Sequence, residues 1–225
     1  MNALKRNVDY LIGEVDGEMS IHIGRGYIQD SGKYKQTLSV PVESLHISDV
    51  LYEQLLQFDL LYAIDSNKVT IGTQDFVASC AVHISLEYAG HNIWKSGVFT
   101  RLPTIISIPT EKNPEPQAWR RLIEYISPLT VGKVGIVVDS ELGKFPLFNS
   151  RNIPICENFF LPENFQLIYA SSERDLASPL NKAIRTCDVD ASKILKILSE
   201  NFTSDELVSK IRSNPNGLIS LAPAS

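Results

Sequence analysis

Two apolar segments of this chain end on an aspartate, and that pattern is the first sign of chemistry. LLYAIDSNK, residues 60–68, ends its apolar run at Asp65, and VGIVVDSEL, residues 134–142, ends its run at Asp139. A carboxylate at the end of a buried strand costs desolvation free energy unless a partner compensates it. A metal ion, an arginine or the backbone amides of the following loop are three such partners, and the sequence alone leaves all three open.

A third acidic position comes from a predicted long helix. The apolar residues of 179–200 share one face, whose centre lies near Cys187 and Ala191. At about 100° per residue, Asp188 lies about 70° from that centre and Asp190 about 90° from it on the other flank. Both acids therefore border the buried face, and Asp188 is the slightly better candidate for a site shared with the strand-end acids.

The elements that must position these acids can be predicted from periodicity. We expect a buried strand at 60–65, an antiparallel hairpin over 76–108, a second buried strand at 131–139 and another strand at 165–171. The apolar stripe Trp119, Leu122, Ile123 and Ile126 predicts a helix that begins near Pro114 or Pro116.

Other segments carry weaker signals. Residues 18–28 alternate as a strand does, residues 48–58 have helical spacing, and Thr203 to Glu206 match a capping box for a last short helix. The stretch after Asp139 contains three prolines and no clear period, which predicts a long irregular loop.

This order of elements, together with the positions of the acids, resembles the RNase H-like superfamily over roughly residues 60–200. The likeness is greatest to bacterial members whose first strand ends in an acid followed by Ser. The resemblance implies an α/β fold with a mixed five-stranded sheet flanked by helices, formed by residues 59–225. Residues 1–58 would then be an N-terminal extension packed on this core.

The same resemblance implies a site. In this superfamily the first strand, the fourth strand and the last helix each bring a carboxylate to one metal cluster, which places Asp65, Asp139 and Asp188 or Asp190 together. The enzymes also place a glutamate on the first helix, and here Glu115 and Glu124 are both available, while Glu141 is a possible substitute. Hard cations such as Mg²⁺ or Mn²⁺ prefer such oxygen ligands.

Two functions follow as expectations. The first is a metal-dependent nuclease that hydrolyses phosphodiesters, with Lys144 and Arg151 in the loop after Asp139 available to contact phosphate or to solvate that loop. The second is a non-catalytic RNase H-like module that binds a protein or nucleic-acid partner, with the acids serving as structural caps.

Composition restricts these readings. The 225 residues carry a net charge of −5, which counts against coating of nucleic acid by bulk electrostatics but allows a local basic strip. Three cysteines, Cys80, Cys156 and Cys187, show no paired spacing, which is typical of reduced thiols in a cytoplasmic protein. No apolar run approaches the length of a membrane span, and the N-terminal residues do not resemble a signal peptide.

Overall fold

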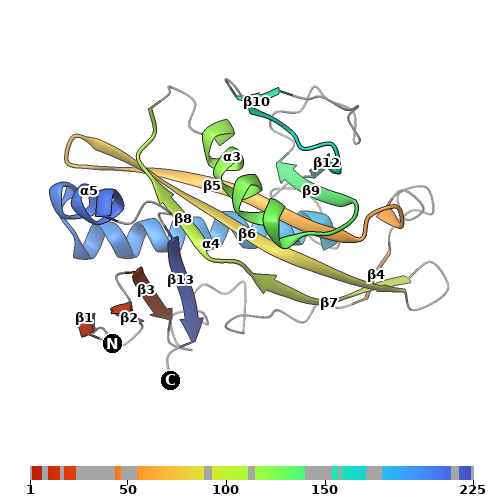
Figure 1. Ribbon diagram of the computed structural model, residues 1–225. Coiled ribbons are helices and arrows are strands. Elements are labelled where there is room, and N and C mark those ends of the chain that lie inside the picture. The colour runs from red at the N-terminus through yellow and green to blue at the C-terminus, as the bar shows by residue number, and fades with distance from the viewer. Residues whose placement is uncertain are drawn as a thin grey trace.

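The computed structural model describes residues 2–6, 10–15, 18–23, 44–46, 55–88, 93–110, 115–139, 154–156, 159–170, 179–213 and 218–223. Within these residues, eleven strands join into one mixed sheet with helices packed on it (Figure 1). The predicted α/β fold with a mixed sheet is therefore confirmed. No helix in the described part of the chain combines the length and the apolar character needed to cross a membrane.

Five strands form the middle of this sheet, in the order β8-β6-β5-β9-β12. Their bounds are Leu60–Ile71 for β5, Gln74–Tyr88 for β6, Thr104–Ser107 for β8, Val134–Asp139 for β9 and Phe165–Ala170 for β12. β6 is antiparallel to both β5 and β8, whereas β9 is parallel to both β5 and β12. The strands that carry Asp65 and Asp139 are thus adjacent and parallel, as predicted.

The sheet is larger than the predicted five strands. The returning half of the 76–108 hairpin is divided into β7 (Ile93–Arg101) and β8, both antiparallel to β6. The division falls at Leu102 and Pro103, and proline has no N–H to continue the ladder. Beyond β8 lies β13 (Leu218–Pro223), and β4 (Ser44–His46) pairs with β7.

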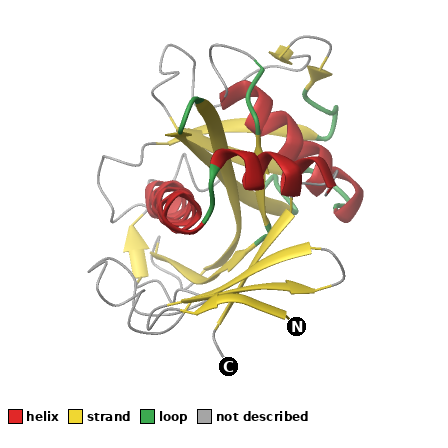
Figure 2. Cartoon of the chain, turned by 90° about the vertical axis from the view of Figure 1, so that its left-hand side faces the viewer, coloured by secondary structure: helices red, strands yellow, loops and turns green. Residues whose placement is uncertain are grey.

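Strands from the two ends of the chain meet in the outer part of the sheet. β1 (Asn2–Arg6), β2 (Tyr10–Val15) and β3 (Glu18–Ile23) are successive antiparallel partners, and β3 pairs in parallel with β13. Both termini consequently lie at the same end of the molecule (Figures 1 and 2). The strand predicted at 18–28 is confirmed over its first six residues. The domain boundary at residue 58 stays a prediction, and most of the helix predicted at 48–58 lies outside the described residues.

The strand that carries Asp65 does not end there, which corrects the sequence prediction. β5 continues to Ile71, and Gly72, with φ of 64°, turns the chain into β6. The secondary structure does not change after Asp65, but the burial does: residues 66–71 stay in the strand and are half-buried or exposed. The extended segment is held across the hairpin by Asp75, which accepts hydrogen bonds from Thr70 Oγ1 at 2.6 Å and Lys68 Nζ at 3.1 Å.

Two helices cover opposite faces of the central strands. The predicted stripe of α3 (Glu115–Ile126) is buried against Tyr62 and Ile64 of β5, and α4 (Pro179–Asn201) packs against Leu61 and Ala63 on the other face. Successive strand residues point to opposite faces, so the run 61–64 must be apolar throughout. Both helices agree with their predicted positions.

The last helix, α5 (Ser204–Ser213), begins with the predicted capping box. The backbone N–H and Oγ1 of Thr203 both donate to Glu206 Oε2 at 2.8 Å, and the Glu206 N–H donates to Thr203 Oγ1 at 3.4 Å.

The segment predicted as an irregular loop after Asp139 contains a small second sheet. β10 (Pro154–Cys156) and β11 (Phe159–Phe160) pair antiparallel within it. Residues 140–153, 157 and 158 lie outside the described part of the chain.

Candidate carboxylate site

Asp65 lies in the middle of β5 and is buried, with 7% of its surface exposed. It follows Leu61 and Ala63 on the α4 face of the sheet, since alternate residues of a strand share a face. Its Oδ1 accepts a hydrogen bond from the backbone N–H of Ser66 at 2.8 Å. That bond resembles the capping role considered from sequence, but residues 66–68 belong to the strand, so no turn follows Asp65.

Asp139 is the last residue of β9 and lies level with Asp65. The parallel register pairs Leu60 with Val134 and Ala63 with Val137, so an offset of 74 residues carried two positions further aligns Asp65 with Asp139. Adjacent strands are about 4.8 Å apart. The two strand acids predicted to act together are therefore neighbours across the sheet.

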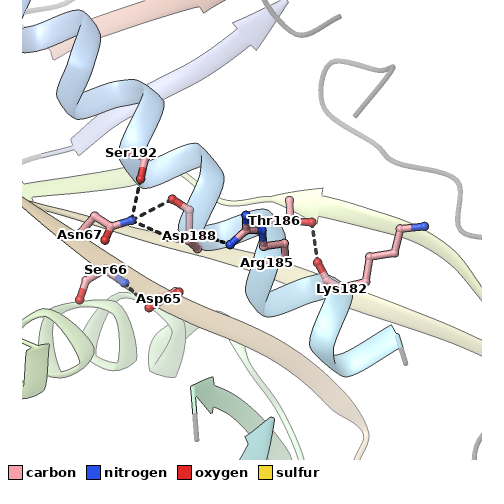
Figure 3. A network of polar contacts seen from close by, with 8 residues as sticks. All are labelled: Asp65, Ser66, Asn67, Lys182, Arg185, Thr186, Asp188 and Ser192. Carbon is pink, nitrogen blue, oxygen red and sulfur yellow. Dashed lines mark hydrogen bonds and ion pairs between the residues drawn. The ribbon is translucent and has the colours of Figure 1, made fainter. Parts of the chain in front are cut away.

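Asp188 lies on α4, above the strand that carries Asp65 (Figure 3). Its Oδ1 accepts a hydrogen bond from Asn67 Nδ2 at 2.8 Å, and its backbone oxygen accepts one from the same nitrogen at 3.0 Å. Arg185 Nη1 donates to Asp188 Oδ2 at 2.9 Å. Asn67 Nδ2 also donates to Ser192 Oγ at 2.9 Å, so one amide group joins β5 to two turns of the helix.

A fourth carboxylate comes from the first residue of α3, Glu115, which acts electrostatically on Asp65. The sequence offered Glu115 and Glu124 equally. Glu124 accepts a hydrogen bond from Arg120 Nε at 2.8 Å on the exposed face of α3, and it is not among the groups that act on Asp65. The structure thus distinguishes the two, and Glu115 is the acid whose charge acts on Asp65.

The electrostatics of Asp65 reflect this gathering of acids. Several causes together raise the pKa of the Asp65 carboxyl to about 8, and burial is the largest of them, while the hydrogen bond from Ser66 opposes the rise. The negative charges of Glu115, Asp188 and Asp139 contribute the rest of the rise, in that order of importance. Carboxylates from α3, α4 and β9 therefore act on one buried carboxyl of β5.

These acids are near one another without forming a closed ligand set. Across the described residues, no three or more His, Cys, Asp or Glu side chains are grouped closely enough to hold one metal ion. Two contacts that hold Asp188, from Arg185 and Asn67, direct its carboxylate toward protein donors.

Asp190, the other helix acid considered from sequence, has a different environment. It forms a buried ion pair with Arg101, the last residue of β7, through Nε–Oδ2 at 2.5 Å and Nη2–Oδ1 at 3.2 Å. Both side chains are less than a tenth exposed. Asp188 is consequently the helix acid that remains available to the site, in line with the sequence preference.

Three residues named from sequence cannot be placed. Glu141, Lys144 and Arg151 lie outside the described residues. Conversely, Asn67 and Arg185 were missed. Asn67 stands two residues after Asp65 and shares its strand face, a signal concealed by the resemblance of SNK to a turn. Arg185 lies three residues before Asp188, at the spacing of a helical ion pair.

No protein-family model matches the chain, and neither a curated protein nor a solved structure matches it.

Proposed function

We propose that this chain is an RNase H-like, metal-dependent nuclease that hydrolyses phosphodiester bonds. The fold part of the proposal is supported by the strand order β8-β6-β5-β9-β12, in which an antiparallel unit is followed by two parallel strands. α3 lies between the two units in sequence and α4 follows them, which is the order that the resemblance implies.

The chemical part rests on one observation. Asp65 is buried in an excess of negative charge, and Glu115, Asp139 and Asp188 contribute that charge from three other elements. Like-charged carboxylates in a low-dielectric site repel one another, and a divalent cation is the partner that compensates several of them at once.

The donor chemistry of these acids fits Mg²⁺ or Mn²⁺, since both are hard cations that prefer carboxylate oxygens. When bound, such ions activate a water molecule for attack on a phosphodiester and stabilise the leaving oxygen. In this proposal Asp65 and Asp139 supply the central oxygens, while Asp188 and Glu115 complete the set from the helices. Asp188 would first exchange its contact with Arg185.

Neighbouring residues keep the acids in place. Asn67 and Asp65 lie on the same face of β5, and the Asn67 amide bonds the backbone oxygen and Oδ1 of Asp188. Asn67 therefore fixes Asp188 relative to Asp65. The Arg101–Asp190 pair fixes the rotation of α4 from the sheet side. Nucleic acid as the substrate and the cytoplasm as the location belong to the same proposal.

A second candidate function is favoured by a specific observation. Asp188 already has two protein donors, and no close group of three acids is present among the described residues. These facts suit a non-catalytic RNase H-like module that binds a protein or nucleic-acid partner and uses its acids for structure.

Cleavage assays distinguish the two. Fluorescently labelled single- and double-stranded DNA and RNA are incubated with Mg²⁺ or Mn²⁺ and resolved by electrophoresis. We expect cleavage by the wild type, and a loss of roughly 100-fold or more in Asp65→Asn and in Asp139→Asn. Asp205→Asn, which removes an exposed acid of α5, is the matched control and should cleave normally. Equal activity in all four proteins would contradict the nuclease function.

A further inference from the structure

A groove lies beside α3, lined by residues of that helix and of the chain around β8 and the short 3-10 helix η1 (Ser127–Leu129). It encloses about 630 Å³, a size typical of sites for small organic ligands. Its lining includes apolar side chains, among them Ile105 and Ile108 near the end of β8 and Leu129 of η1. We call this feature the α3 groove.

Polar contacts hold the walls of the α3 groove in place. Gln117 Nε2 donates to Thr110 Oγ1 at 2.6 Å, and Gln117 Oε1 accepts from the Thr110 N–H at 3.3 Å. Arg120 is bonded to Glu124 and lies 5.3 Å from the centroid of the Phe159 ring. Side chains that are already fixed lose little conformational entropy when a ligand binds.

One basic group in this groove remains available. Arg121 is exposed and makes no hydrogen bond or ion pair with the described residues. Two arginines against the single acid Glu124 make the lining locally positive, although the whole chain carries −5. Arginine is well suited to bind phosphate, because its guanidinium group presents several donors in one plane.

We infer that the α3 groove binds one nucleotide unit, with its phosphate on Arg121 and its base against Tyr125 and the apolar side chains of the lining. Aromatic and guanidinium planes stack on any base, and the amide of Gln117 offers a hydrogen bond to a base edge. A purely apolar partner would leave Arg121 uncompensated. A purely inorganic anion would leave the aromatic and aliphatic lining unused.

The position of the α3 groove connects it with the carboxylates. α3 begins with Glu115, and Arg121 follows six residues later, about 9 Å further along the helix axis. That distance corresponds to roughly three stacked nucleotides at about 3.4 Å each. As the binding site for a substrate strand, the groove rests on the proposed nuclease function. As a nucleotide site, it is testable separately from cleavage.

The test measures binding without cleavage. Fluorescence anisotropy is recorded for fluorescein-labelled single-stranded DNA and RNA decamers in low-salt buffer containing EDTA. We expect Arg121→Glu to weaken binding roughly tenfold or more and to lower the slope of log affinity against log salt by about one. Arg121→Lys should stay within roughly threefold of the wild type. Arg212→Glu, an equal charge change on exposed α5, is the control and should have little effect.

Two further arms separate the ligand sources. Adenosine monophosphate is added as an unlabelled competitor, and Tyr125→Leu removes the aromatic face while keeping an apolar side chain. Displacement of the decamer by the mononucleotide assigns the site to free nucleotides, and binding without displacement assigns it to a strand. In either case Tyr125→Leu should weaken binding.

The inference is overturned if the wild type binds neither decamer nor mononucleotide, or if Arg121→Glu and Arg212→Glu weaken binding equally. Failure of the nuclease proposal has a different signature: no Mg²⁺- or Mn²⁺-dependent cleavage, with anisotropy that still depends on Arg121.

Discussion

α4 carries two aspartates two residues apart, and their environments differ sharply. Asp190 meets Arg101 in a buried pair in which the charges are matched. Asp188 is partly exposed, is held by Arg185 and Asn67, and adds to the negative charge acting on the buried Asp65. Buried acids with a matched cation hold elements together, whereas a buried acid among other acids requires protonation or an external cation. Because of this difference, the candidate cation site is assigned to the acids around Asp65 and not to Asp190.

The largest loss of stability is expected when the buried Arg101–Asp190 ion pair is broken. Asp190→Ala removes the carboxylate that pairs with the buried Arg101 guanidinium, which should destabilise the protein by about 3–5 kcal/mol. Urea denaturation followed by circular dichroism measures the change. The double variant Arg101→Met with Asp190→Leu should recover most of the loss, since neither buried charge remains. A loss below ~1 kcal/mol in Asp190→Ala would show that this pair contributes little.

At the carboxylate site, removing the charge of Asp65 should instead stabilise the protein. The pKa of Asp65 is about 8 in the folded state against an ordinary value of 3.8, so the folded state holds a proton that the unfolded chain releases. Stability therefore falls as the pH rises from about 4 to about 8. Asp65→Asn should be more stable than the wild type by about 4 kcal/mol at pH 7, and equal to it at pH 3.

Melting curves in EDTA across this pH range test the Asp65 prediction. A constant difference between the two proteins at every pH would rule out titration of Asp65 as its cause.

A smaller effect is expected at Asn67, which links β5 to Asp188 on α4. Asn67→Ala removes the amide that holds the Asp188 carboxylate, a hydrogen bond to a charged group worth about 1.5–3 kcal/mol. Asn67→Ala should therefore lower stability by this amount, and the loss should shrink when Asp188→Asn is also present. A double-mutant cycle measured by denaturation gives the coupling, and additive effects would contradict a direct interaction.

The smallest effect is expected at Arg185. Its ion pair with Asp188 is partly exposed, so Arg185→Ala should change stability by only about 0.2–1 kcal/mol. The same substitution should raise the affinity for Mn²⁺. Arg185 and the cation compete for the Asp188 carboxylate, so the variant should bind Mn²⁺ more tightly than the wild type. Manganese titration followed by electron paramagnetic resonance measures this, and weaker binding would contradict the competition.

The sequence predicted much of the framework because its signals are local. The stripe that includes Trp119 and Ile126 identified α3, the capping box at Thr203 identified the start of α5, and two apolar runs identified β5 and β9. β13 was missed, since β3 and β13 pair across almost the whole chain length and no local pattern records such a partner. β1 and β2 were also missed, although they pair with neighbours in the sequence.

The site was predictable only in part. Asp65 and Asp139 could be identified because carboxylates interrupt apolar runs, and the helical angle favoured Asp188. The choice of Glu115 over Glu124 depends on where the start of α3 lies above the sheet, and the pairing of Arg101 with Asp190 depends on tertiary contacts. The turn-like residues after Asp65 stay extended because β6 supplies cross-strand partners, which a single strand's sequence does not show.

The central claim is that the carboxylates of Asp65, Asp139, Asp188 and Glu115 form a site for a divalent cation. Isothermal titration calorimetry with Mn²⁺ tests it most directly, on the wild type, Asp65→Asn and the control Asp205→Asn at pH 8. We predict saturable binding to the wild type and the control, weaker binding at pH 6 because Asp65 must lose its proton, and loss of binding in Asp65→Asn. Absence of binding in the wild type, or equal binding in Asp65→Asn, would contradict the claim.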